Sequence, residues 1–173
     1  FNNDARYFDT LWSLDLATST WSPLPDSGNR PAGRFWSRMV HLPESDQFVL
    51  FGGHDDQTLG NRNDTWIYDP NGEAWLELTA GDQFNAPANG FCDFPDDFTT
   101  IDLEIPERRN AHSLVFSQSC GHAVLFGGKT DCGAINDVWH YRDNAWTESV
   151  TADEGESCRR WRNNPDNCMN LCF

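Results

Sequence analysis

The sequence predicts an all-β fold built from repeated antiparallel units, and three observations support this prediction. Residues 31–53 align without a gap with residues 106–128, so that Pro31 falls on Pro106 and Gly53 falls on Gly128. Each copy contains a short apolar run that ends in Gly-Gly, and each then continues into Asn-Asp-x-Trp. Self-similarity of this kind is the signature of a repeat architecture. No stretch of the chain shows convincing helical periodicity.

Each unit is predicted to hold four strands. The run 49–51 and its counterpart 124–126 are apolar throughout and stop at glycines, as expected of a strand buried on both faces. Residues 66–69 alternate as a half-buried strand does, and Pro70-Asn71-Gly72 provides a turn because proline presets φ and Asn-Gly accepts a positive φ. The predicted strands are 37–42, 47–52, 65–69 and 74–78 in one unit, and 112–117, 122–127, 137–141 and 145–149 in the other.

A partial copy of the unit lies at the front of the chain. Trp12 and Trp21 have the same spacing as Trp66 and Trp75. An Arg, an apolar run ending in Gly-Gly, Asn-Asp-x-Trp-x-Tyr and a spaced Trp together resemble the kelch motif. In that family each unit is a four-stranded antiparallel blade of a β-propeller. The resemblance covers roughly residues 9–149 and implies the fold more than the function, since kelch propellers serve many roles.

The resemblance implies a kelch-type β-propeller fragment with about two complete four-stranded blades, half a blade and a Cys-rich irregular tail. A propeller ring usually needs four to eight blades. We therefore expect either that the chain is part of a longer polypeptide or that another subunit supplies the missing blades. The expected divisions are a half blade 1–25, a blade 31–79, an insert 81–107, a blade 108–149 and a tail 150–173.

The charge of the chain excludes some classes of partner. The net charge is −15 and the pI is about 4.4. Nucleic acids require a basic face, so they are not expected as partners, and anionic membrane surfaces are disfavoured as well. No run of apolar residues is long enough to cross a bilayer, so no transmembrane segment is predicted. The acidity suits a soluble extracellular protein, or one that binds cations or basic partners.

The cysteines indicate an oxidising compartment. An even count with a Cys-rich tail suggests disulfides, and therefore an extracellular or periplasmic location. Cys120 and Cys132 flank one predicted strand, which separates them by about 15–20 Å, beyond the reach of a disulfide. The six candidates are Cys92, Cys120, Cys132, Cys158, Cys168 and Cys172.

The resemblance to a propeller further implies that Cys92 pairs with Cys132, because their two loops would emerge on the same side. Cys120 is then expected to pair with one tail cysteine while the other two close a small loop. The competing interpretation is a metal site formed by Cys168 and Cys172, with Cys158 as a third thiolate. No histidine follows Trp146, so disulfides are favoured and no metal or cofactor is predicted.

Three polar motifs have mainly structural interpretations. Arg34 and Arg109 are expected to pack on a tryptophan or to bond backbone carbonyls between blades. Asn63-Asp64 and Asn136-Asp137 are expected to cap the loop before the third strand of each unit. The third motif, His54-Asp55-Asp56, is predicted to form an exposed polar loop in which a cation is conceivable, with Asp64 nearby.

The insert is the part of the chain that departs most from the repeat. Long aromatic and acidic loops in compact domains usually carry function. We therefore predict a non-catalytic protein-binding or scaffolding module that belongs to a larger assembly, with its partner contacts in the insert. The predicted partner-binding residues are Phe84, Phe91, Phe94 and Phe98.

Two alternative functions remain open. Eight tryptophans suggest a carbohydrate-binding propeller, but six of them fall at repeat-equivalent positions and are expected in the core, leaving Trp36 and Trp161. Some kelch-like propellers resemble copper radical oxidases of the galactose oxidase type, which need a Cys-linked Tyr, a second Tyr and two His. Tyr68 and Tyr141 occupy equivalent repeat positions, which leaves only Tyr7, so such a site would lie outside this segment.

Overall fold

The computed structural model describes residues 7–24, 28–55, 60–84, 99–100, 102–130 and 133–152. All regular elements within these ranges are β-strands, so the predicted all-β class is confirmed there. The described ranges also contain no helix with the length and apolar character needed to cross a membrane.

Two four-stranded antiparallel sheets make up most of the described chain, each with its strands side by side in chain order. The first sheet contains β3 (Arg38–Leu42), β4 (Gln47–Asp55), β5 (Gly60–Asp69) and β6 (Ala74–Thr79). The second contains β9 (Ser113–Ser117), β10 (His122–Thr130), β11 (Gly133–Arg142) and β12 (Ala145–Val150). All eight strands predicted in the two repeats are present, with the turns between them where the sequence places them.

The Gly-Gly pairs do not end their strands, contrary to the prediction. In β4 the pairing register shifts between Phe51 and Gly53, and β10 shifts in the same way between Phe126 and Gly128. Gly53 has a φ of 106°, a conformation that a residue with a Cβ rarely adopts. A Cβ there would lie 2.9 Å from the Cβ of Ser37. The glycines therefore form a bulge against the chain entering the sheet, and β4 continues beyond it.

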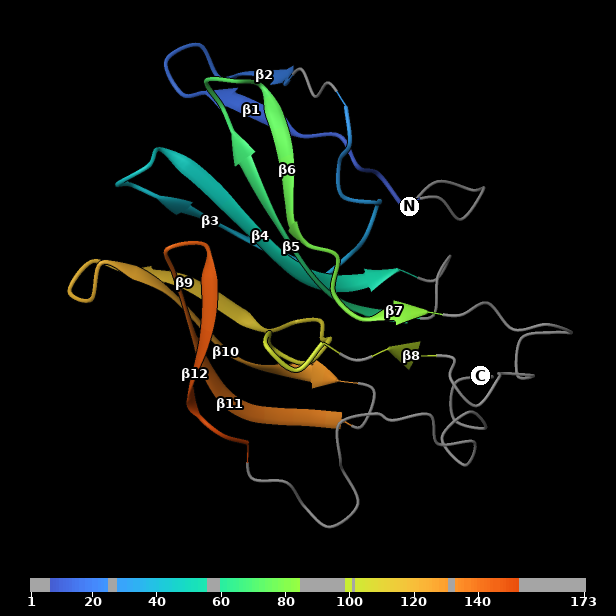
Figure 1. Cartoon of the computed structure of the whole chain (residues 1–173). Coiled ribbons are helices and arrows are strands. Elements are labelled where there is room, and N and C mark those ends of the chain that lie inside the picture. The colour runs from blue at the N-terminus through green and yellow to red at the C-terminus, as the bar shows by residue number, and fades with distance from the viewer. Residues whose placement is uncertain are drawn as a thin grey trace, which may run out of the picture.

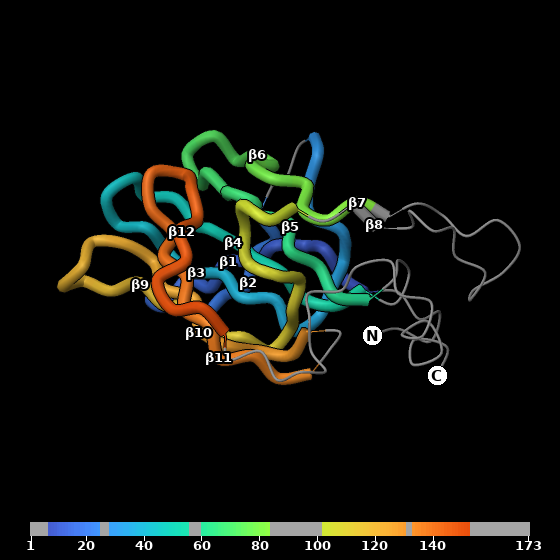
Figure 2. The backbone as a smooth tube through the Cα atoms, turned by 60° about the horizontal axis from the view of Figure 1, so that its bottom comes forward, coloured from blue at the N-terminus to red at the C-terminus, as the bar shows by residue number. Residues whose placement is uncertain are grey.

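Two shorter pairs of strands complete the described fold. The hairpin β1 (Trp12–Asp15) and β2 (Thr20–Pro23) lies beside the first sheet, on the side away from the second sheet (Figure 1). The short strands β7 (Gln83–Phe84) and β8 (Thr99–Thr100) come between the two sheets in the sequence, and they pair with each other. They lie at the side where β4 and β10 end, away from the tight turns (Figure 2).

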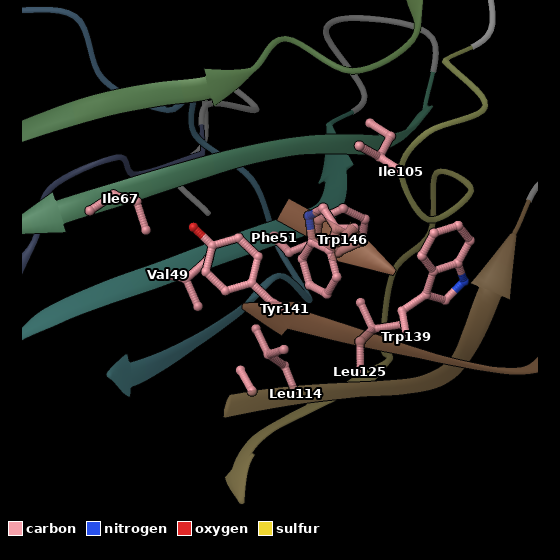
Figure 3. Packing of buried hydrophobic residues seen from close by; sticks show 10 residues of the cluster. Val49, Phe51, Ile67, Ile105, Leu114, Leu125, Trp139, Tyr141 and Trp146 are labelled. Carbon is pink, nitrogen blue, oxygen red and sulfur yellow. The ribbon is translucent and has the colours of Figure 1, made fainter. Parts of the chain in front are cut away.

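The apolar core lies between the two four-stranded sheets (Figure 3). Phe51, on the first sheet, packs edge-on against Trp146 of the second, with ring centroids 4.9 Å apart. The indole nitrogen of Trp146 donates a hydrogen bond of 2.9 Å to the hydroxyl oxygen of Thr65. The buried residues of this core are Val49, Phe51, Ile67, Ile105, Leu114, Ala123, Leu125, Trp139, Tyr141 and Trp146.

Backbone hydrogen bonds join the two sheets where the second one begins. The amide of Gly53 donates to the carbonyl of Arg109 at 2.9 Å, and the amide of Arg109 donates to the carbonyl of Arg62 at 3.0 Å. The amide of Ala111 donates to the carbonyl of Trp36, also at 3.0 Å. The peptide at Arg109 is thus held by the ends of two strands of the preceding sheet.

Candidate functional site

Each repeat contains a buried ion pair that links the entry of its first strand to its third strand. The guanidinium of Arg34 binds both carboxylate oxygens of Asp64, at 2.5 and 2.8 Å, and also donates to the carbonyl of Gly52. The indole of Trp66 donates to the same carboxylate at 2.8 Å. A two-pronged Arg–carboxylate contact fixes orientation as well as charge. The pair therefore locks the bulge region of the sheet.

The second repeat reproduces this arrangement with its own residues. Arg109 binds both oxygens of Asp137, and the indole of Trp139 donates to that carboxylate at 2.8 Å. Arg109 also donates to the carbonyls of Gly127 and Glu107, which lie in its own repeat and not across the two sheets as predicted. Because every charge in the two pairs is compensated, the pairs serve structural roles.

The prediction that the Asn-Asp dipeptides cap a loop is wrong. Asn63 and Asp64 lie inside β5, and Asp137 lies inside β11. The carboxylates of Asp64 and Asp137 each bind an arginine and a tryptophan indole. The side chain of Asn63 bonds Asp82, far along the chain, instead of a local amide. The sequence pattern suggested a cap because Asx residues favour turns, but buried arginines are stronger partners for a carboxylate.

A cluster of polar side chains anchors both ends of the insert, and we call it the anchor cluster: Asn63, Asp82, Asp102, Pro106 and Arg108. The side chain of Asn63 bonds Asp82 twice: its amide nitrogen donates to the carboxylate at 3.0 Å, and its oxygen accepts from the Asp82 backbone amide at 2.8 Å. The same amide nitrogen donates to the carbonyl of Pro106 at 3.2 Å. One asparagine of β5 therefore holds the beginning and the end of the insert.

The remaining contacts of the anchor cluster close the base of the insert. The carboxylate of Asp82 accepts a hydrogen bond from the backbone amide of Asp102 at 3.0 Å. Its other oxygen lies 3.8 Å from the guanidinium of Arg108, which is almost fully buried. The adjoining Ile105 is buried in the core. The strands β7 and β8 extend from this base as a short stem.

Sequence reasoning missed most of the anchor cluster, although a signal was present in the repeat alignment. Arg108 stands where the first repeat has Gly33, and Asn110 stands where it has Phe35. Asn110 donates to the side chain of Asn61 across the two sheets. Where one repeat has a polar residue and the other has glycine or an apolar residue, the polar side chain indicates a contact that only one of the two repeats makes.

The predicted partner-binding residues lie at or beyond the stem. Phe84 is the last residue of β7, and the structure places its backbone there. Phe91, Phe94 and Phe98 lie outside the described residues. The described strands on either side bring the two ends of this segment together, because Phe84 pairs with Thr99.

The cysteine predictions fall mostly outside the described residues, where Cys92, Cys132, Cys158, Cys168 and Cys172 lie. Cys120 is described, exposed and carries a free thiol. Hydrogen bonds from Ser117 and then Ser119 lower the pKa of this thiol below its usual value. The predicted disulfides remain predictions.

The His54-Asp55-Asp56 motif does not form an exposed loop over its described part. His54 and Asp55 belong to β4, and Asp55 is buried and paired with Arg62 at 2.9 Å. Asp56 lies outside the described residues. Among the residues that the structure describes, no group of three or more His, Cys, Asp or Glu side chains is placed to hold a metal ion.

The tryptophans divide into core and surface residues in a way that the repeat only partly predicts. Trp66, Trp139 and Trp146 are buried as expected, whereas Trp75 is only half-buried. Trp12 and Trp21 are wrong predictions, because they are 51 % and 61 % exposed although they occupy the same repeat positions. Trp36 is exposed, and Trp161 lies outside the described residues.

Tyrosine and histidine side chains in the core have shifted ionisation. Tyr68 and Tyr141 are buried at equivalent positions of the two sheets, and burial raises the pKa of Tyr141. Burial, with the positive charges of Arg109 and Arg38, lowers the pKa of His112 to about 3. Neither ring nitrogen of His112 has a hydrogen-bond partner in the described structure. His112 is therefore a neutral packing residue, in edge contact with the ring of Phe51.

The far ends of the two sheets enclose a shallow groove of about 290 Å³. It lies between the turn after β3 and the turn after β11, away from the anchor cluster. Its lining includes Leu42, Glu44, Gln47, Phe116, His122 and Asn144. This lining is mixed and open, without the few converging polar groups around an apolar pocket that are typical of a small-molecule site.

The described polar residues are thus arranged to hold the sheets and the insert in place. No protein-family model matches the chain. The resemblance to kelch therefore remains an expectation that rests on the motif residues.

Proposed function

We propose that the chain is a non-catalytic protein-binding module, a segment of a kelch-type β-propeller that presents the insert 81–107 to a protein partner. The observation that carries this proposal is the anchor cluster, in which Asn63 holds Asp82 and Pro106 at the two ends of the insert. A loop with fixed ends loses less conformational freedom on binding than a free one, which favours affinity. The aromatic side chains of the insert supply the kind of contact area that dominates protein interfaces.

The arrangement of the sheets supports the propeller part of the proposal. In a propeller, blades pack face to face around an axis with their inner strands close together. Here the two sheets pack face to face, and the first strand of one, β3, lies alongside the first strand of the other, β9. The hairpin β1–β2 has the sequence of the last two strands of a unit and lies on the other face of the first sheet.

The proposed location is extracellular or periplasmic. Support comes from the composition: six cysteines, three of them in the tail after residue 150, and a net charge of −15. Such a chain suits an oxidising compartment, where disulfides persist. Within a larger assembly, this acidic surface would favour partners with basic faces.

The test compares partner binding by variants that leave the sheets unchanged. Affinity capture with the wild-type chain from the extracytoplasmic fraction of its source first identifies a candidate partner. The purified partner is then measured by biolayer interferometry against the wild type and a Phe91→Ala/Phe94→Ala/Phe98→Ala variant. We expect at least a hundredfold loss of affinity, since truncation of one aromatic anchor commonly costs about 2 kcal/mol, roughly thirtyfold, and the variant truncates three.

A matched control makes the result specific. Leu76→Ala removes an exposed apolar side chain from β6, outside the insert, and should leave the affinity unchanged. The thermal unfolding of all variants should agree within a few degrees. An affinity of the triple variant within twofold of the wild type would refute the role of the insert.

Carbohydrate binding is the second candidate, and the exposed tryptophans favour it. Trp12, Trp21 and Trp36 present large aromatic surfaces to solvent. Sugars stack on such rings, and buried repeat tryptophans would not be available to them. A glycan array separates the two candidates when it is probed with the wild type, a Trp36→Ala variant and the triple insert variant. Carbohydrate binding predicts that Trp36→Ala loses the signal and that the insert variant retains it.

A further inference from the structure

The two ends of the stack of sheets expose different, complementary faces. Paired residues in an antiparallel sheet share a face, so the registers define each one. The hairpin face consists of Trp12, Leu14 and Trp21 on β1 and β2. The terminal face, on the side of the second sheet away from the core, consists of Val115, Val124, Phe126, Val138 and His140.

Each face is the repeat equivalent of one half of the interface already present between the two sheets. Phe126 corresponds to Phe51, and Val138 corresponds to Thr65. Trp21 occupies the position of Trp146. Since Trp146 packs on Phe51 and bonds Thr65 in the core, the equivalent placement sets Trp21 beside Phe126 and Val138.

Both faces are open and largely uncharged. Phe126 is 52 % exposed, whereas its counterpart Phe51 is fully buried, and Trp21 is 61 % exposed. Charged residues make up 23 % of the chain, yet the hairpin face contains no Asp, Glu, Lys or Arg, and the terminal face is charged at the far end of β11, where the register places Arg142. Exposed apolar patches of this kind mark interaction surfaces in soluble proteins.

We propose that the partner for each face is a second copy of this chain, packed head to tail, with the hairpin face of one copy on the terminal face of the next. The same chain carries both halves of an interface that it already forms internally, so a second copy brings the matching half to each end. This inference rests on the repeated stacking described under the proposed function but not on the insert or its partner. A contact between two different faces leaves one of each free, so association continues beyond the dimer.

One difference between the two repeats provides a test of how the two faces align in the contact. Thr65 accepts the indole hydrogen bond of Trp146 in the core, but its counterpart on the terminal face is Val138. The indole of Trp21 therefore lacks an acceptor in the proposed contact. Val138→Thr supplies a hydroxyl of nearly the same shape at that position, and it should tighten association about fivefold, the value of one added hydrogen bond.

The experiment is sedimentation velocity on the full chain, over roughly 10 to 500 µM because two short strands form a small, weak interface. Free thiols are blocked beforehand so that disulfide exchange cannot link the copies. The wild type should associate reversibly with rising concentration. Phe126→Glu and Trp21→Glu should each be monomeric, since both side chains are largely exposed and their replacement should leave the fold intact, as circular dichroism would verify.

Mixing the two variants is the decisive step. Each variant retains one intact face, so an equimolar mixture of Phe126→Glu and Trp21→Glu should form dimers and stop there. Leu103→Glu, which places a charge on an exposed apolar residue of the insert, should associate like the wild type. A monomeric wild type at the highest concentration, dimers of either variant alone, or a monomeric mixture would overturn the proposal. None of these variants alters the insert phenylalanines, so the partner-binding test remains separate.

Discussion

Replacing Asp137 with asparagine should destabilise the fold far more than the same replacement at an exposed ion pair. Asp137 neutralises Arg109, and the two side chains are 3 % and 0 % exposed. The substitution removes the charge and one of the two oxygens that bind the guanidinium. Arg109 keeps its bonds to the carbonyls of Glu107 and Gly127, but its charge is left buried without a counter-ion.

The expected magnitude follows from burial. Removing one partner of a buried ion pair costs about 3–5 kcal/mol, because the remaining charge stays desolvated. Asparagine retains one acceptor oxygen, so we expect a loss near the lower limit, about 3 kcal/mol. The control is Asp9→Asn, since Asp9 and Arg30 form a pair at 3.1 Å with side chains 36 % and 38 % exposed. Exposed pairs contribute about 0–1 kcal/mol.

The assay is urea unfolding followed by tryptophan fluorescence, under non-reducing conditions. With a slope of about 2 kcal/mol per M, the midpoint should fall by about 1.5 M for Asp137→Asn and by less than about 0.5 M for Asp9→Asn. Both variants remove one negative charge from a chain of net charge −15, so the general charge effect cancels. Midpoints of the two variants within about 0.5 M, a difference of about 1 kcal/mol, would refute the reasoning.

Three further predictions concern ionisation, the insert and the cysteines. The unfolded chain protonates His112 below about pH 6.5 while the fold keeps it neutral to about pH 3. The free energy of unfolding should therefore fall as the pH drops through this window, with a slope up to about 1.4 kcal/mol per pH unit steeper than that of His112→Gln. Plots of unfolding free energy against pH that run parallel for the two proteins would contradict this. Gly81→Ala should increase hydrogen exchange at β7 and leave that of β10 unchanged. The added Cβ would press on the side chain of Asn63 and approach the amide nitrogen of Asp64 to 2.8 Å, and the φ of 72° at this position disfavours alanine. Iodoacetamide should label Cys120 in the native protein, because its thiol is free and exposed; protection that is lost only on reduction would contradict this and would support the predicted bridge to the tail.

The strands were predictable because their signals are local. Alternation and the Pro70-Asn71-Gly72 turn each lie within one unit of sequence, and the gapless alignment of the second unit repeats the same signals. The extension of β4 beyond Gly53 was not predictable in the same way. The Gly-Gly pair predicts the end of a strand. In the structure it forms a bulge instead, because another part of the chain packs closely against Gly53.

Burial and partner choice depend on neighbours that the local sequence does not name. Trp12 matches Trp66 in the repeat, but its side chain faces away from the first sheet and no described sheet covers it, so it is exposed. The local sequence of Asp64 predicts a loop cap, because its actual partner Arg34 is distant in the sequence. Asp82 similarly meets Asn63 only once the insert has folded back on β5. Long-range polar contacts of this kind require the fold itself.

The shared peptide at Arg109 has a consequence for how the chain folds. Its amide and carbonyl are both engaged by the first sheet, through Arg62 and Gly53, while its side chain reaches Asp137 in the second. The peptide and side chain of Arg109 are therefore fully bonded only when both sheets are formed. Coupling between adjacent repeats of this type makes folding propagate from one unit to the next instead of starting independently in each. A lesion in β4 or β5 should consequently be transmitted along the chain as a loss of cooperativity.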